Sequence, residues 1–161
     1  ETLTQVELDA REAIWNRLKE LQNTPGCENV FLLDVASQLG VRASRTVAGV
    51  TELTLPDWEN QRAYPDVIGI GGSYDFLKDR CCPIPYGALL PKRIENLLAA
   101  GRCVAADNKM LNYTRLIAPC MLTGHAAGAA AALAVKNGCT PRQVDIAALQ
   151  GVLRDQGAYL G

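Results

Sequence analysis

The sequence predicts a mixed α/β chain, and three observations indicate this class. Apolar residues recur at helical spacing from Val6 to Leu21. A short apolar run of β-favouring residues, VFLLDVA, covers residues 30–36. A second long apolar stretch, rich in Ala and Gly, follows Pro119 and stops before Gly138. Helical and extended segments that alternate in this way are typical of α/β proteins.

Length and charge narrow the class of partner. The chain has 161 residues, 48% of them apolar, which is enough to bury a core in one domain. Its 16 basic and 17 acidic side chains give a net charge of -1, so a nucleic-acid-binding module or an anionic membrane partner is disfavoured. The six cysteines lack CxxC spacing, and the chain has a single histidine, His125, that could join them in a metal site, so we predict no metal site. We expect the cysteines to be reduced thiols in a cytoplasmic protein.

The amino-terminal half is predicted to hold one long helix followed by extended segments and loops. Thr4 and Glu7 fit a capping box, Leu3 and Leu8 fit a hydrophobic staple, and the helix ends at Pro25-Gly26. Besides residues 30–36, a second extended stretch is predicted over residues 46–55. Residues 58–91 are rich in Pro and Gly and are expected to form loops and short strands.

The carboxyl-terminal half is predicted to hold a strand and two helices. Residues 96–100 read as a buried strand that ends in a tight turn at Gly101. The next helix is expected from Pro119 to Asn137, with Gly138 as its terminator. Thr140-Pro141 is expected to start a last helix, over residues 142–156. Residues 116–135 carry no charge, but they are mainly Ala and Gly with Pro119 among them, so we reject a membrane span.

The start of the Ala- and Gly-rich helix is the candidate binding feature. Proline suits the first turn of a helix, where its missing N–H has no partner to lose. We therefore expect the amides of Cys120, Met121 and Leu122 to be free donors that stabilise negative charge on a ligand. Each glycine inside a helix lowers the stability of the helix by roughly 1 kcal/mol relative to alanine. The glycines of this segment therefore indicate that another part of the structure packs closely against the helix. A tightly packed core helix without a ligand is the alternative.

Two stretches carry a family resemblance. LLDVASQLGVRASRTVAG, at residues 32–49, and IPYGALLPKRIENLLAAGRCVAADNKMLNYTRLIAPCMLTGHAAGAAAALAVKNGCTPRQVDIAALQGVLRDQGA, at residues 84–158, resemble FAD-dependent oxidoreductases of the glutathione-reductase-like superfamily. The likeness is to the carboxyl-terminal portion, in the branch related to fumarate reductase flavoproteins. The resemblance implies the end of an FAD-binding Rossmann-like domain, with part of a substrate or cap domain.

The resemblance also implies domains and site residues. Residues 1–95 would form the substrate or cap side, and residues 96–161 the end of the FAD-binding domain. Ala100, Gly101 and Arg102 would line the ribityl chain of FAD, although Arg102 is also typical of a surface cation. Pro119, Cys120 and Met121 would cap the pyrimidine edge of the flavin. Catalytic roles on an anionic substrate or on hydride-transfer charge fall to Arg45, which Arg42 accompanies, and to Arg115.

Two family features are missing. The dinucleotide-binding GxGxxG is absent, and GIGGS at residues 69–73 does not replace it, because Tyr74 stands where the third glycine belongs. The chain also opens at Glu1 without a methionine, so we expect the rest of the FAD site on an amino-terminal portion or a partner subunit. The usual catalytic histidines are absent, which leaves Asp107, Tyr113 or Tyr74 for proton transfer.

The predicted function is therefore part of an enzyme. Complete, it transfers a hydride or electron pair between an organic small-molecule substrate and FAD, and this chain alone is expected to be inactive. A noncatalytic subunit or scaffold that keeps the flavoprotein fold is the alternative. His125 is expected to cap or pack, and Cys81-Cys82 to be loop thiols, because adjacent cysteines form a strained disulfide.

Overall fold

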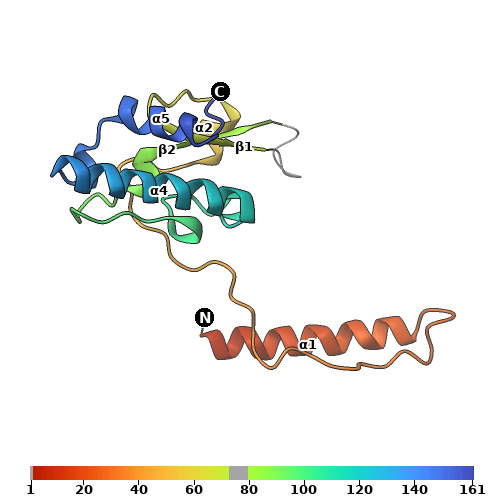
Figure 1. Ribbon diagram of the computed structural model, residues 1–161. Coiled ribbons are helices and arrows are strands. Elements are labelled where there is room, and N and C mark those ends of the chain that lie inside the picture. The colour runs from red at the N-terminus through yellow and green to blue at the C-terminus, as the bar shows by residue number, and fades with distance from the viewer. Residues whose placement is uncertain (1, 73–79) are drawn as a thin grey trace. The chain divides into compact units, whose positions relative to one another are not determined.

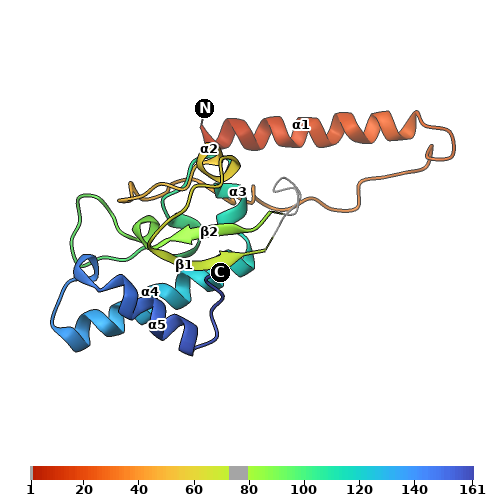
Figure 2. The same cartoon turned by 90° about the horizontal axis from the view of Figure 1, so that it is seen from above.

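The computed structural model describes residues 2–72 and 80–161, and it divides into two compact units, residues 1–41 and 42–161 (Figures 1 and 2). In the described residues, helices and a two-stranded sheet make a mixed α/β chain, as the sequence predicts. The division at residue 41 is geometric, so the functional boundary at residue 95 stays a prediction. Each unit is described by itself.

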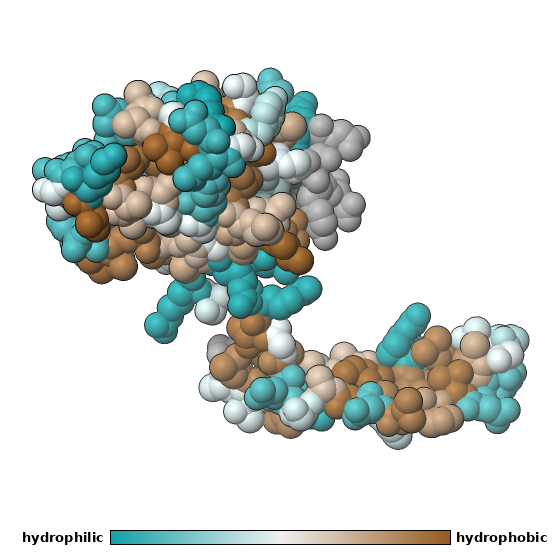
Figure 3. All heavy atoms as spheres, in the orientation of Figure 1, coloured by the Kyte–Doolittle hydropathy of each residue, from teal (hydrophilic) through white to brown (hydrophobic). Residues whose placement is uncertain are grey.

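The first unit is one helix with an extended return. Helix α1 (Leu3–Gln22) is capped by Thr2, whose hydroxyl accepts the Gln5 N–H at 3.2 Å. The predicted cap at Thr4 is wrong, because Thr4 already lies in the first turn, and the staple fails with it, since Leu3 and Leu8 are exposed. Residues 30–36 are extended but pair with no strand in the described chain, so the predicted strand is not formed there. Apolar surface is prominent on this unit (Figure 3).

The second unit is built around a short antiparallel ribbon. Strands β1 (Val67–Gly71) and β2 (Cys82–Pro85) confirm short strands in the Pro- and Gly-rich region. Short helices precede and follow the ribbon: α2 (Leu55–Glu59), η2 (Tyr86–Leu89), η3 (Gly101–Cys103) and α3 (Leu111–Thr114). The long helix α4 (Ile117–Asn137) packs against β1 and against α5 (Ile146–Asp155). The 3₁₀ helix η4 (Pro141–Gln143) lies between α4 and α5 in the chain.

Three predicted elements differ here from the structure. Residues 46–55 form only isolated bridges, at Gly49 and Leu53, before α2 begins. Residues 96–100 are not a strand, because within the described chain only Ala99 donates from this stretch, to the Leu89 carbonyl at 2.9 Å. The last helix starts at Ile146 rather than at residue 142, because the Asp145 carboxylate caps it and accepts the Ala147 and Ala148 amides.

Two predicted turns are confirmed. Gly138 ends α4 in the left-handed conformation, with φ of 63°. Gly101 forms the tight turn before η3, with φ of 70°. Both positions favour glycine because a Cβ is strained at positive φ.

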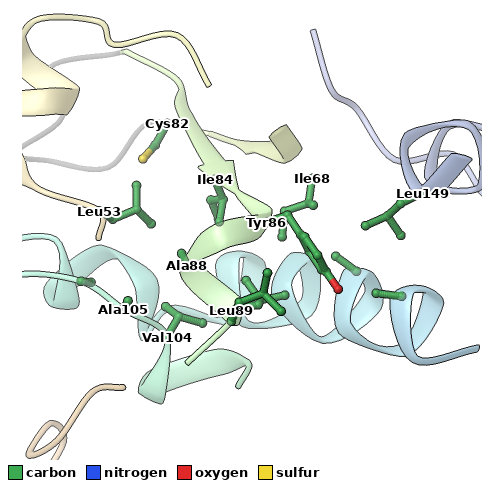
Figure 4. Close-up of a cluster of buried hydrophobic side chains, with 14 of the residues drawn as sticks. Leu53, Ile68, Cys82, Ile84, Tyr86, Ala88, Leu89, Val104, Ala105 and Leu149 are labelled. Atoms are coloured by element: carbon green, nitrogen blue, oxygen red, sulfur yellow. The ribbon is translucent and has the colours of Figure 1, made fainter. Parts of the chain in front are cut away.

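The core of the second unit lies between the ribbon, α4 and α5 (Figure 4). Ile68 and Ile84 come from the two strands, and Tyr86 donates its hydroxyl to the Pro141 carbonyl at 2.7 Å. Helix α4 contributes small residues: Ala126, Ala130 and Ala134 are all buried. The helix therefore lies close to the ribbon, which fixes where its amino end points.

Candidate functional site

The amino end of α4 presents two free backbone donors. The helix begins at Ile117, two residues before the predicted start, so Pro119 occupies its third position and not its first. The Cys120 amide is not free, because it donates to the Leu116 carbonyl at 3.0 Å, and Met121 and Leu122 follow it inside the helix. Among the amides of this first helical turn, those of Ile117 and Ala118 have no acceptor in the described chain.

A buried threonine joins this helix end to the Gly101 turn. The Gly101 N–H donates to Thr123 Oγ1 at 2.9 Å, and the Thr123 hydroxyl donates to the Pro119 carbonyl at 2.8 Å. Thr123 is fully buried, so these bonds are shielded from water. Sequence reasoning missed Thr123, although a hydroxyl residue four positions after Pro119 on a helix of Ala and Gly was a visible signal.

The predicted cofactor residues fall around this junction. A Cβ on Gly101 would lie 3.6 Å from the Cys120 sulfur, so the turn and the first turn of α4 are in contact. Pro119 is buried, Ala100 is half-buried, and Arg102 and Met121 are exposed. The structure thus brings Gly101, Pro119 and Cys120 together, while a contact of any of the six residues with a cofactor stays a prediction.

The arginines predicted to bind substrate differ in their surroundings. Arg115 is half-buried at the end of α3, two residues before Ile117, and its Nε lies 3.4 Å from Asn112 Oδ1. Arg45 is exposed, as Arg42 is, and neither side chain forms a hydrogen bond or ion pair with another described residue. Of the two, only Arg115 lies next to the amino end of α4 in sequence.

The three candidates for proton transfer fare differently. Asp107 is occupied by backbone: its Oδ2 accepts the Leu55 amide at 2.8 Å, and its Oδ1 accepts the Lys109 and Met110 amides. Those bonds make it a structural carboxylate. Tyr113 is buried, and its hydroxyl has no partner among the described residues. Tyr74 lies outside the described residues.

Burial keeps the phenol of Tyr113 neutral to a higher pH than that of an exposed tyrosine. Desolvation raises the pKa of this phenol well above its usual range, and the thiols of Cys82 and Cys81 raise it further. A Cβ on Gly71 would collide with the Tyr113 hydroxyl, so the phenol lies directly over that glycine. Tyr113 is therefore a neutral packing residue in this arrangement.

Glycines of the GIGGS segment serve packing. Gly69 lies under Leu122 of α4, since an added Cβ would come within 2.7 Å of that side chain. Gly71 gives room to Tyr113 in the same way. The two glycines let α3 and α4 lie close to β1, which agrees with the interpretation that this segment is not a dinucleotide-binding motif.

The glycines of α4 lie on the side of the helix that faces away from the ribbon. An added Cβ on Gly124 or Gly128 would meet no atom of another described element within 4 Å, so neither glycine serves a close contact there. They lie on the exposed face of the helix with larger apolar residues at its ends: Ile117, Met121 and Val135 are 81%, 69% and 85% exposed. This open face is apolar.

The remaining candidates are thiols and one histidine. His125 Nε2 lies 2.6 Å from Gln156 Oε1, which ties α4 to the end of α5 and fits the predicted packing role. Both cysteines are free thiols, and Cys81 is exposed outside any strand, but the predicted loop position is wrong for Cys82, which is buried in β2. Burial, and then the neighbouring Cys81, raises the pKa of Cys82 to about 12.

By length and composition α4 could cross a membrane, yet its inner face is buried against the ribbon. No group of His, Cys, Asp and Glu suited to a metal occurs in the described residues. The free amides of Ile117 and Ala118 lie at the positive end of a long helix, where donors of this kind suit an anion.

Comparison with known families identifies the class. A family model described as FAD dependent oxidoreductase matches residues 1–153. The chain belongs to this family, whose chemistry is flavin redox and whose cofactor is FAD. No curated protein and no solved structure matches the chain.

Proposed function

We propose that this chain forms one side of the flavin site of an FAD-dependent oxidoreductase in the glutathione-reductase-like superfamily, in the branch related to fumarate reductase flavoproteins. The observation that carries the proposal is the pair of free amides at Ile117 and Ala118, held beside the Gly101 turn by Thr123. Bound FAD supplies the redox chemistry by accepting or giving a hydride or an electron pair. The substrate is a small organic molecule.

The amino end of α4 suits the pyrimidine edge of a flavin. That edge carries negative charge in the reduced form, and free amides at a positive helix end stabilise such charge. Met121 is exposed one turn further along the helix and offers apolar surface to the ring. The Gly101 turn, with Ala100 and Arg102 beside it, is assigned to the ribityl chain.

The rest of the FAD site comes from an amino-terminal portion or a partner subunit. The open face of α4, with Gly124 and Gly128 at its centre, permits close approach of another backbone. A groove of about 320 Å³ runs between this helix and residues 96–98, whose backbone has no partner in the described chain. We assign both surfaces to the portion that carries the dinucleotide-binding turn. A cytoplasmic location and the absence of membrane and nucleic-acid partners remain part of the proposal.

Arg115 is the better placed of the two arginines for substrate. Its guanidinium is half-buried and follows α3 directly into the start of α4. A planar cation there would bind an anionic substrate group beside the flavin. Arg45, in the segment that resembles the cap, is assigned to the substrate from the other side.

A noncatalytic subunit that keeps the flavoprotein fold is the second candidate. The carboxylate oxygens of Asp107 accept hydrogen bonds from backbone amides, and the buried hydroxyl of Tyr113 packs against Gly71. Neither side chain is available to exchange protons with a substrate, and the histidines typical of the family are missing. A scaffold that binds FAD without turnover is consistent with these observations.

The decisive variant is Ile117→Pro in the intact protein that contains this chain. Proline at the first helical position removes one free amide while Leu116 stays extended, with ψ of 161°, as a residue before proline prefers. Ile117 is 81% exposed, so little packing is lost. A hydrogen bond to a charged group contributes about 1.5–3 kcal/mol, so we expect FAD affinity to fall at least about tenfold. Fluorescence titration with FAD measures it.

The matched control is Ile117→Ala, which removes the same side chain but keeps the amide. It should bind FAD as the unchanged protein does, and both variants should unfold at a similar denaturant concentration. Equal FAD affinity in the proline and alanine variants would show that the amide does not contact the cofactor. A purified intact protein that gains no flavin absorbance when FAD is added would refute the flavin proposal itself.

Anaerobic reduction separates the enzyme from the scaffold. A panel of small organic acids, alcohols and amines is mixed with the FAD-loaded intact protein, and the visible flavin absorbance is followed. Bleaching by one substrate class identifies an oxidoreductase acting on it. A flavin that dithionite reduces but every substrate leaves oxidised favours the scaffold.

A further inference from the structure

A small pocket lies at the carboxyl end of helix α2, and none of its residues takes part in the flavin proposal. The pocket has a volume of about 250 Å³ and is lined by Trp58, Gln61, Arg62, Arg80, Cys81 and Pro83. One water-sized group occupies roughly 30 Å³, so the pocket has room for about eight non-hydrogen atoms. That volume suits one small molecule, whereas a strand or a helix of another chain would be too large.

Arg62 is held at this pocket by two contacts. Its Nη1 lies 2.9 Å from Asp57 Oδ2, and its guanidinium carbon lies 5.3 Å from the centre of the Tyr64 ring. The ion pair and the cation–π contact both restrict the side chain. Arg62 therefore keeps its position while its Nε and Nη2 groups have no acceptor among the described residues.

Arg80 is oriented in a comparable way. Its Nη1 donates to the Glu59 carbonyl at 3.3 Å, and its guanidinium carbon lies 5.9 Å from the centre of the Trp58 ring. The Trp58 ring is itself fixed, because it is buried and its indole N–H donates to the Cys81 carbonyl at 3.3 Å. No carboxylate of the described residues forms an ion pair with Arg80. Arg80 thus brings one uncompensated positive charge to the pocket.

The charge and the lining of the pocket select the class of ligand. Two guanidinium groups and the Asp57 carboxylate sum to one positive charge, which a single carboxylate neutralises. The paired N–H groups of a guanidinium match the two oxygens of a carboxylate. Trp58 and Pro83 add apolar surface for a short carbon chain. We propose that this pocket binds a small monocarboxylic acid, with its carboxylate between Arg62 and Arg80.

Binding of butyrate to the intact protein that contains this chain tests the proposal, with ligand-observed NMR as the measurement. We expect saturable binding at millimolar butyrate and much weaker binding of butyramide, which has the same shape and no charge. Sulfate should compete weakly at constant ionic strength. Equal binding of butyrate and butyramide overturns the proposal, and so does sulfate that competes as well as butyrate, which would mean an adventitious ion only. Absence of saturable binding overturns it as well, including the case in which a carboxylate of the protein itself fills the pocket.

The variant Arg80→Gln locates the binding site. It removes a charged hydrogen-bond donor, so the affinity for butyrate should fall at least about tenfold. Arg80→Lys keeps the charge but not the planar fork and should lose less. Arg17→Gln is the control, because Arg17 is another exposed arginine, paired with Glu20, and it should bind butyrate unchanged. Binding that survives Arg80→Gln, as binding at Arg115 would, overturns the proposal.

The variant Asp57→Asn separates a binding role of these arginines from a structural one. It removes the carboxylate that competes for Arg62, so butyrate should bind about threefold more tightly. An ion pair that only holds the end of α2 would show lower stability and no gain in affinity, and that outcome overturns the proposal. Thermal unfolding by circular dichroism checks the fold of each variant. If Arg80→Gln does not fold, Arg80→Lys and Asp57→Asn decide.

Discussion

At the scale of single residues, Thr123 connects two segments that sequence reasoning treated separately. Its buried hydroxyl accepts from Gly101 and donates to Pro119. Thr123→Val leaves the Gly101 amide without its acceptor, and a buried donor in that state costs about 1–3 kcal/mol. Urea unfolding should show that loss.

Two further variants control this prediction. Thr123→Ser keeps the hydroxyl and should recover most of the loss. Thr24→Val removes an exposed hydroxyl at the end of α1 and should change the free energy of unfolding by less than about 0.5 kcal/mol. If Thr123→Val unfolds like Thr24→Val, the hydroxyl does not hold the turn.

The pair Gly71 and Tyr113 offers a test of close packing. A Cβ at residue 71 collides with the Tyr113 hydroxyl, so Gly71→Ala should cost about 1–3 kcal/mol. Tyr113→Phe removes a buried hydroxyl that has no described partner and should be close to neutral. In the double variant the alanine should cost less, with a coupling of at least about 0.5 kcal/mol.

Gly72→Ala is the matched control for Gly71→Ala, because a Cβ there meets no atom within 4 Å. It should be nearly neutral in urea unfolding. Additive costs in the double variant would contradict the packing of the Tyr113 hydroxyl on Gly71.

At the scale of elements, buried groups in the ribbon and in the turn that follows it contribute to the loss of stability in alkali. Burial raises the pKa of Cys82 in β2 from 9.0 to about 12, and it raises the pKa of Tyr86 in η2 from 10.0 to about 12. In both cases the folded state holds its proton more tightly than the unfolded chain does. The stabilisation is therefore complete below pH 9.0 and is lost as pH rises toward 12.

Urea unfolding at a series of pH values between about 8 and about 11 should show a falling free energy of unfolding. Cys82→Ala should show a shallower fall, because one of the buried groups with a raised pKa no longer titrates. Cys81→Ala is the control, since Cys81 is exposed, and it should keep most of the dependence. The same slope in all three proteins would contradict the burial of the Cys82 thiol.

Elements whose signals are local were predictable, and those that need a distant partner were not. Gly138 ends α4 because glycine favours a left-handed turn, and the sequence shows this directly. The β-favouring residues 30–36 stay unpaired because a strand needs a second strand, which the described chain does not offer them. The helix start near Pro119 was misplaced by two residues because proline is tolerated throughout the first turn.

The candidate site was predictable only in outline, for a related reason. Pro119 and Gly101 mark a helix start and a turn in the sequence, but their junction depends on the Thr123 hydroxyl across 22 residues. Which amides are free depends on the exact first residue of α4, so the donors moved from residues 120–122 to residues 117 and 118. Asp107 looked available because its contact with Leu55 spans 52 residues.

At the scale of the whole molecule, the two units differ in the size of their buried hydrophobic core. Residues 42–161 contain the continuous buried cluster around Ile68, Ile84 and Leu149, whereas the first unit has a single helix and a return. Burial of apolar surface is the main driving force of folding, so residues 42–161 should unfold cooperatively without residues 1–41. Their melting temperature should lie within about 4 °C of that of the second unit in the full chain.

Circular dichroism during heating measures the thermal unfolding of residues 42–161 and of a separate peptide of residues 1–41. A peptide of residues 1–41 should show weak helicity and no cooperative transition at low concentration, because an isolated helix with little tertiary packing is marginal in water. Broad, non-cooperative melting of residues 42–161 would show instead that the buried cluster needs the first unit, and the division at residue 41 would then be geometric only.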